Sequence, residues 1–101
     1  MAWKKVQVRT IPNADTAFEK MNDEVLSYMK EKYIDTGKRT SFSVSGSDDG
    51  LVLTYTSIFK DEASKNEITL DSTIATESTR RNTINAANGI TNKTTLDEEF
   101  S

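Results

Sequence analysis

The chain has 101 residues and a formal net charge of −3 at pH 7, and 35% of its residues are hydrophobic. This length is enough for one domain, and the low apolar content predicts a thin core that an oligomer interface would help to stabilise. The acidic balance argues against a nucleic-acid partner, which requires a basic surface. Because the chain contains neither Cys nor His, disulfides, the usual zinc ligands and the commonest general base are excluded.

The sequence also argues against a membrane partner. No apolar run approaches the roughly 20 residues that a membrane-spanning helix needs. The first residues lack the apolar stretch of a signal peptide. We therefore expect a cytoplasmic protein.

Residues 3–11 are predicted to form the first strand, because Val6, Val8 and Thr10 alternate with polar and charged residues. Pro12 ends it, since proline cannot donate to the ladder. Residues 13–33 are predicted to form the first helix, because their apolar side chains recur in steps of three or four.

Residues 39–45 alternate polar and apolar side chains, which indicates a half-buried strand. The run SGSDDG that follows is typical of a turn, so a hairpin is expected. Residues 51–60 are the most apolar stretch and carry apolar groups on both faces. That pattern predicts a central strand with cover on both sides.

Residues 61–67 are predicted to form a short helix, followed by a break at 70–72 and a second helix over 73–87. The Asn-Gly pair at 88–89 marks the end of that helix. A disordered acidic segment is the alternative for this polar region. Residues 90–96 alternate as an edge strand, and residues 97–101 are expected to be an acidic tail.

The predicted order is strand, helix, strand, strand, helix, strand, within a single domain over residues 1–101. This is the ferredoxin-like βαββαβ pattern, an α+β fold. It implies a four-stranded antiparallel sheet with two helices on one face and the first and third strands in the centre. The second face is open unless something covers it, so we expect a homo-oligomer, a dimer in the simplest case.

This βαββαβ order resembles the dimeric α+β barrel proteins, in which two ferredoxin-like sheets pack face to face. The runs YTSIFKDEASKNE and RNTINAANGIT are also similar to small uncharacterised proteins of tailed phages. The phage resemblance implies a location in the host cytoplasm or the virion. Haem-degrading members of the barrel group use a His that this chain lacks, and no catalytic motif accompanies the resemblance.

The candidates for a ligand pocket between helices and sheet are Trp3, Asn13, Tyr28 and Tyr55, with Tyr33 beside them. Aromatic and amide side chains of this kind can bind flat organic ligands. The alternative, which a thin core favours, is that the aromatic residues pack the interior and the interface.

The candidates for a self-association interface are Val52, Tyr55, Ile58 and Phe100. We expect a charged residue at Tyr55 or Ile58 to break the assembly. Phe100, in the run DEEF, either docks on a partner or folds back onto its own domain or a dimer mate.

Two basic groups have alternative interpretations. The first could contact phosphate, but a solvated face is favoured because acidic residues are equally frequent in that half of the chain. It contains Lys4, Lys5, Arg9, Lys38 and Arg39. Arg80 and Arg81 could anchor an acidic partner, but pairing with Glu77 is favoured.

The sequence contains no Ser-His-Asp or Cys-His set, no Gly-rich phosphate loop and no metal-ligand spacing. We therefore predict no catalytic residue, no metal site and no cofactor. The preferred function is a non-catalytic structural or interaction protein that self-associates through its sheet, and an unlike protein partner is a further option. The alternative is a cofactor-independent small-molecule enzyme or ligand-binding protein of the dimeric α+β barrel type.

Overall fold

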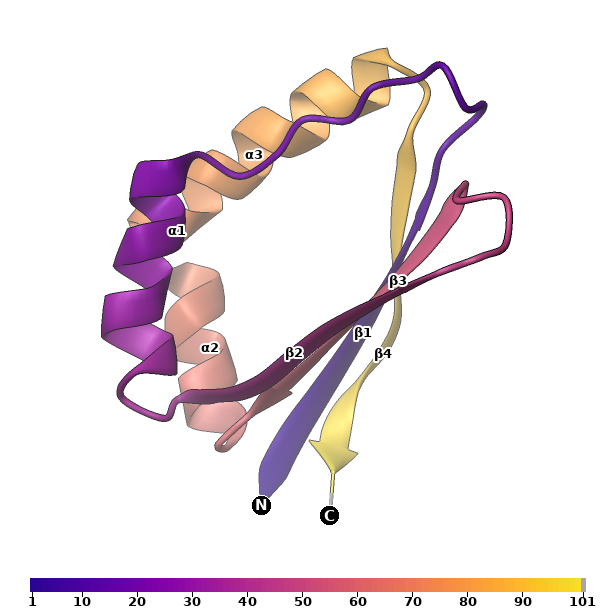
Figure 1. Cartoon of the computed structure of the whole chain (residues 1–101). Helices are drawn as coiled ribbons and strands as arrows, with labels where there is room; N and C mark the ends of the chain where they lie inside the picture. The colour runs from indigo at the N-terminus through magenta and orange to yellow at the C-terminus, as the bar shows by residue number, and fades with distance from the viewer. Residues whose placement is uncertain (101) are drawn as a thin grey trace.

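Figure 1 presents the computed structural model of the chain, which describes residues 1–100. The elements are β1 (Ala2–Thr10), α1 (Asp23–Met29), the π-helical turn η1 (Lys30–Ile34), β2 (Arg39–Gly46), β3 (Val52–Phe59), α2 (Glu62–Leu70), α3 (Ser72–Ala87) and β4 (Thr91–Phe100). The predicted α+β order is confirmed. Residues 61–87 form two helices separated by Asp71, so the alternative of a disordered segment there is wrong. Within residues 1–100, no helix combines the length and the apolar character needed to cross a bilayer.

The sheet is antiparallel with the strand order β2-β3-β1-β4, so β1 and β3 are central as predicted. Trp3 pairs with Phe59 and Arg9 with Leu53 across these two strands. Because side chains alternate along a strand, the odd-numbered residues of β1 and β3 share one face and the even-numbered residues share the other. The helices all lie on the odd-numbered side (Figure 1).

The core is small, as the composition predicts. Its main cluster lies between the helices and the end of the sheet where β1 begins and β3 ends. Trp3, Met21 and Tyr28 are partly buried at its border. The buried members of the cluster are Met29, Tyr33, Phe59, Ile68 and Ile74.

The predicted helix over residues 13–33 is wrong in its first half. The α-helix begins only at Asp23, with Asn22 as N-cap, and residues 12–22 run in an irregular path beside α3 (Figure 1). Asn13 does not cap a helix. Its side-chain oxygen accepts hydrogen bonds from the Asp15 amide and the Thr16 hydroxyl in a local turn.

The side chains of α3 explain why this segment is not helical. Four hydrogen bonds from α3 satisfy backbone groups that a helix would otherwise pair internally. The supporting side chains come from another part of the chain, so local periodicity does not reveal them. The bonds are Glu19 N to Asn85 Oδ1 at 2.8 Å, Asn22 N to Glu77 Oε1 at 2.8 Å, Arg80 to the Lys20 carbonyl at 3.2 Å and Asn88 to the Ala17 carbonyl at 3.3 Å.

The predicted acidic tail is also wrong for residues 97–100, which belong to β4. In the β1–β4 register, Lys4 lies opposite Glu98 and Lys5 lies opposite Asp97. Opposite charges across neighbouring strands stabilise such pairing, so the acids extend the strand instead of ending it. Phe100 pairs with Ala2 on its own domain.

Asp71 joins the helices to one another. One carboxylate oxygen accepts hydrogen bonds from the Thr73 and Ile74 amides at the start of α3. The other accepts from the hydroxyls of Tyr28 and Tyr33 at 2.6 and 2.5 Å. A single side chain, 5% exposed, therefore fixes α1 and η1 against the junction of α2 and α3.

The environment of Asp71 keeps it ionised. Burial alone would raise its pKa, but the hydrogen bonds from Tyr28, Tyr33 and Ile74 outweigh burial and hold the pKa well below its usual value. Burial, followed by the bond to Asp71, raises the pKa of Tyr33 to about 12. Neither group titrates near neutral pH, so the pair acts as a fixed charged anchor and not as an acid and base.

The first prediction concerns this anchor. Asp71→Asn keeps an oxygen for the α3 cap but removes the charge and one acceptor. We expect the free energy of unfolding at neutral pH to fall by roughly 2–3 kcal/mol, because hydrogen bonds to a charged group are stronger than neutral ones. Chemical denaturation followed by circular dichroism measures it. The control is Asp35→Asn, which breaks only the exposed pair with Lys30 and is expected to cost less than about 1 kcal/mol.

The same variant tests the charge through its pH dependence. Since the pKa of Asp71 is lower in the folded than in the unfolded state, its stabilising contribution is complete above the unfolded pKa of about 4 and is lost as pH falls through the folded pKa. The stability difference between wild type and Asp71→Asn should therefore shrink in strongly acidic buffer. An equal difference at neutral and acidic pH would contradict a role for the charge.

A further prediction concerns the support of residues 12–22. Hydrogen bonds from Arg80 and from the Asn22 amide lower the pKa of Glu77 to about 2. Glu77→Ala removes the acceptor of the Asn22 amide, so that amide should exchange hydrogen with solvent faster. Hydrogen exchange followed by NMR measures this, with the exposed Glu62→Ala as control. Unchanged protection of the Asn22 amide in Glu77→Ala would contradict the contact.

Candidate functional site

The sheet face turned away from the helices, here the open face, has apolar and threonine side chains at its centre, and β2 adds Ser41, Ser43 and Ser45 at one side. It comprises the even-numbered positions of β1 and β3 and the positions of β2 and β4 that pair with them. Its charged members, Lys4, Lys93 and Glu98, include one pair that lies opposite in register, Lys4 with Glu98. The central side chains are Val6, Val8, Thr54, Thr56, Ile58 and Leu96.

Three of the four predicted interface residues lie on the open face. Val52 and Phe100 are at its ends, and Ile58 lies opposite Lys4. Tyr55 does not belong to this face, because it is an odd-numbered residue of β3 and contacts Arg9 on the helix side. The expectation that a charge at Tyr55 would disrupt an assembly through the open face is therefore corrected.

The four predicted ligand residues do not come together. Trp3 and Tyr28 border the core cluster, where Trp3 donates to Asp97 and Tyr28 donates to Asp71. Asn13 lies in the exposed turn after β1. For Trp3 and Tyr28 the structure agrees with the packing alternative, and Tyr55 contacts Arg9, which lines a pocket.

Three arginines instead approach the interior between the helices and the sheet. Arg9, Arg39 and Arg81 each have a buried Nε without a hydrogen-bond partner among residues 1–100. Burial lowers the pKa of Arg39 to about 10. Burial lowers the pKa of Arg81 too, and the charge of Arg9 lowers it further, so these two guanidinium groups repel each other.

Arg9 is the least exposed of the three residues, at 7%. Its guanidinium carbon lies 5.5 Å from the ring centre of Phe18 and 5.0 Å from that of Tyr55, and both contacts are cation–π interactions. Its Nη1 donates to the Tyr55 hydroxyl at 3.4 Å. The solvated basic patch predicted from the sequence is therefore wrong for Arg9.

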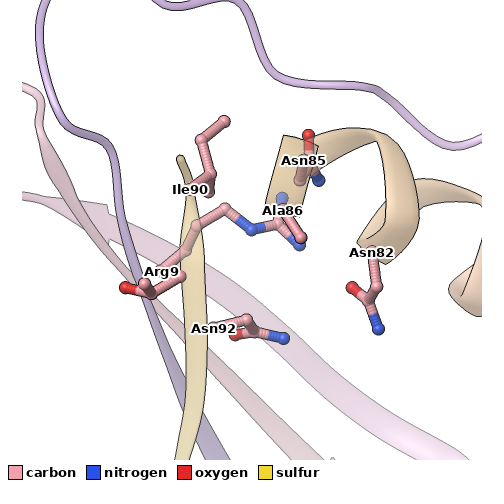
Figure 2. A pocket seen from close by; sticks show the side chains of 7 residues that line it. Arg9, Asn82, Asn85, Ala86, Ile90 and Asn92 are labelled. Atoms are coloured by element: carbon pink, nitrogen blue, oxygen red, sulfur yellow. The ribbon is translucent and has the colours of Figure 1, made fainter. Parts of the chain in front are cut away.

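A pocket opens beside Arg9, with a volume of about 420 Å³. Figure 2 shows the Arg9 side chain reaching from β1 toward the last turns of α3, with Asn82 on α3 and Asn92 on β4 at its sides. Asn85 is 3% exposed; its Oδ1 accepts from the Glu19 amide, while its Nδ2 has no partner among residues 1–100. The pocket is lined by Arg9, Asn82, Asn85, Ala86, Ile90, Thr91 and Asn92.

The site offers hydrogen-bond donors and positive charge. Guanidinium and amide groups can hold a polar ligand, but no group here combines a nucleophile with an adjacent base. Sequence reasoning missed Asn82 and Asn85 because the run NTINAANG was interpreted only as a helix ending, and it missed Asn92 because that residue was assigned only to an edge strand. The spacing of Asn82 and Asn85, three apart on a helix, was the one available signal that they share a face.

Arg80 and Arg81 differ in their surroundings. Arg80 donates to Glu77 at 2.6 Å and also lies 3.3 Å from Glu19. This confirms the pairing with Glu77 that was favoured from the sequence. The Arg81 Nε is 3.8 Å from the same Glu77 oxygen and does not form a hydrogen bond with it.

Comparison with known proteins places the fold. No family model matches the chain, and no curated protein matches it. Among solved structures, the chain is similar to Rv0793 from Mycobacterium tuberculosis, with a TM-score of 0.50 and 11% sequence identity over 98% of each chain. That protein shares the ferredoxin-like α+β fold. At this identity the likeness shows that the chain has a ferredoxin-like α+β fold, and it does not extend to the predicted phage relationship.

Proposed function

We propose that this protein is a non-catalytic structural or interaction protein that self-associates through the open face of its sheet. The occupant of that face is a second copy of the chain. The observation that carries the proposal is the apolar centre of the open face, at Val6, Val8, Ile58 and Leu96, which no helix of the described chain covers. A sheet face that is always in water normally carries polar side chains.

The small core supports the same proposal. A chain with few buried apolar residues gains stability by removing further apolar surface from water, at roughly 25 cal/mol per Å². Two copies related by a two-fold axis present identical faces, so each apolar centre can cover the other.

We extend the proposal to a phage-encoded protein, on the resemblance to small tailed-phage proteins predicted from two sequence runs. Its location would then be the host cytoplasm or the virion. An unlike protein that binds the open face is the competing occupant, and the solution mass of the isolated chain separates the two.

Small-molecule binding is the second candidate function, either as a ligand-binding protein or as a cofactor-independent enzyme. The pocket beside Arg9 favours it, because its volume of about 420 Å³ falls in the range of ordinary ligand sites. The pocket lies on the helix side of the sheet. The two functions therefore use different faces and are compatible.

The prediction for the first function is a change of solution mass. Wild-type protein should have twice the mass of one chain in size exclusion with light scattering. Ile58→Glu should be monomeric, because removing a carboxylate opposite Lys4 from water in the interface costs more than the ion pair returns, which raises the dissociation constant by roughly 10-fold or more. The matched control is Leu70→Glu, since Leu70 is 80% exposed on α2, and this variant should remain dimeric.

Circular dichroism checks that Ile58→Glu is folded, and Leu96→Glu on the outer strand β4 is a second variant if it is not. A monomeric wild type, or Ile58→Glu and Leu96→Glu that both keep the dimer mass, would contradict self-association through this face.

A further inference from the structure

Arg9 is a buried positive charge without a negative partner. Its side chain is 7% exposed, and among residues 1–100 no carboxylate lies within ion-pair distance of it. A buried charge without a counter-charge is costly. The rings of Phe18 and Tyr55 stabilise the face of the guanidinium, and the Tyr55 hydroxyl accepts a long hydrogen bond from Nη1, but Nε has no acceptor among residues 1–100.

The nearby acids do not supply that acceptor. Glu77 accepts hydrogen bonds from Arg80 and from the Asn22 amide. Glu19 lies against Arg80. Arg9 and Arg81 are therefore close enough to repel each other, and neither of these two acids forms an ion pair with Arg9.

A second buried donor without a partner in the described chain lies on the pocket wall beside Arg9. Asn85 is 3% exposed, and its Nδ2 has no hydrogen-bond partner among residues 1–100. Arg9 Nε likewise has no hydrogen-bond partner among these residues. Two buried donors on one pocket wall, one of them charged, match a ligand group that has several acceptor oxygens and a negative charge.

We propose that this pocket binds the oxyanion group of a small molecule, a carboxylate or a phosphate, with Arg9 and Asn85 as its donors. The inference rests on the second proposed function, small-molecule binding, and names the class of ligand. Asn82 and Asn92, which also line the pocket and flank Arg9 in Figure 2, donate to the polar remainder of the ligand. The volume of the pocket, about 420 Å³, favours a compact anion over a macromolecule.

The experiment is an NMR titration of the ¹⁵N-labelled full chain with four probes at matched ionic strength: sodium succinate, inorganic phosphate, succinamide and sodium chloride. Succinamide has the shape of succinate without its charge. We expect succinate or phosphate to shift the side-chain amide signals of Asn82, Asn85 and Asn92 and the Arg9 Nε–H signal. Succinamide and chloride should not shift them. Whichever of succinate and phosphate binds tighter identifies the oxyanion.

Two variants assign the effect to the pocket. Arg9→Gln should weaken binding by roughly 10-fold or more, since a hydrogen bond to a charged group is lost. Lys60→Gln removes the same charge from an exposed position at the opposite end of the sheet and should bind as the wild type does. If Arg9→Gln does not fold, Asn82→Ala at the exposed rim of the pocket takes its place, with weaker binding expected.

The outcomes are distinct. Shifts spread over the surface lysines, or an equal loss of binding in Arg9→Gln and Lys60→Gln, would overturn the proposal, as would no shift with either anion. Pocket shifts of equal size with succinate and succinamide would overturn anion recognition while leaving small-molecule binding intact. The solution mass of the same samples reports separately on self-association.

Discussion

The buried carboxylate of Asp71 fixes the helices against one another, and the helical layer depends on it. One of its carboxylate oxygens caps α3, and the other receives the hydroxyls of Tyr28 and Tyr33. The side chains of the core pack around this charged junction, with Tyr33 itself in the cluster. In a chain with 35% hydrophobic residues, hydrogen bonds to a buried charge supply part of the order that apolar packing provides elsewhere.

The polar helix α3 extends this order to the pocket. Glu77 and Asn85 hold the backbone of residues 12–22, and that segment places Phe18 against the Arg9 guanidinium. The Glu19 amide occupies Oδ1 of Asn85 and leaves Nδ2 without a partner among residues 1–100. The irregular segment therefore determines which Asn85 atom is free at the pocket wall. Its Glu19 amide binds the acceptor oxygen, and the donor nitrogen remains.

The central strands give the two sides of the sheet different chemistry. On the helix side, β1 and β3 carry Trp3 and Phe59 at the core cluster and Arg9 and Tyr55 beside the pocket. On the open face, the same strands carry Val6, Val8 and Ile58. Strict alternation along a strand keeps these sets apart, so a change on one side leaves the side chains of the other in place. The proposed interface and the proposed ligand site therefore lie on opposite faces of one small sheet.

The sequence by itself determined the four strands, the two helices of the second half and the ferredoxin-like order, because alternation, turn residues and capping are local properties. It also determined which residues of β3 share a face. Tertiary structure alone decided that residues 12–22 are not helical and that Asp97 and Glu98 continue β4, because their partners lie on α3 and β1. It also decided the pocket: Arg9, Asn85 and Asn92 are far apart in sequence, and only sheet register and helix packing bring them together.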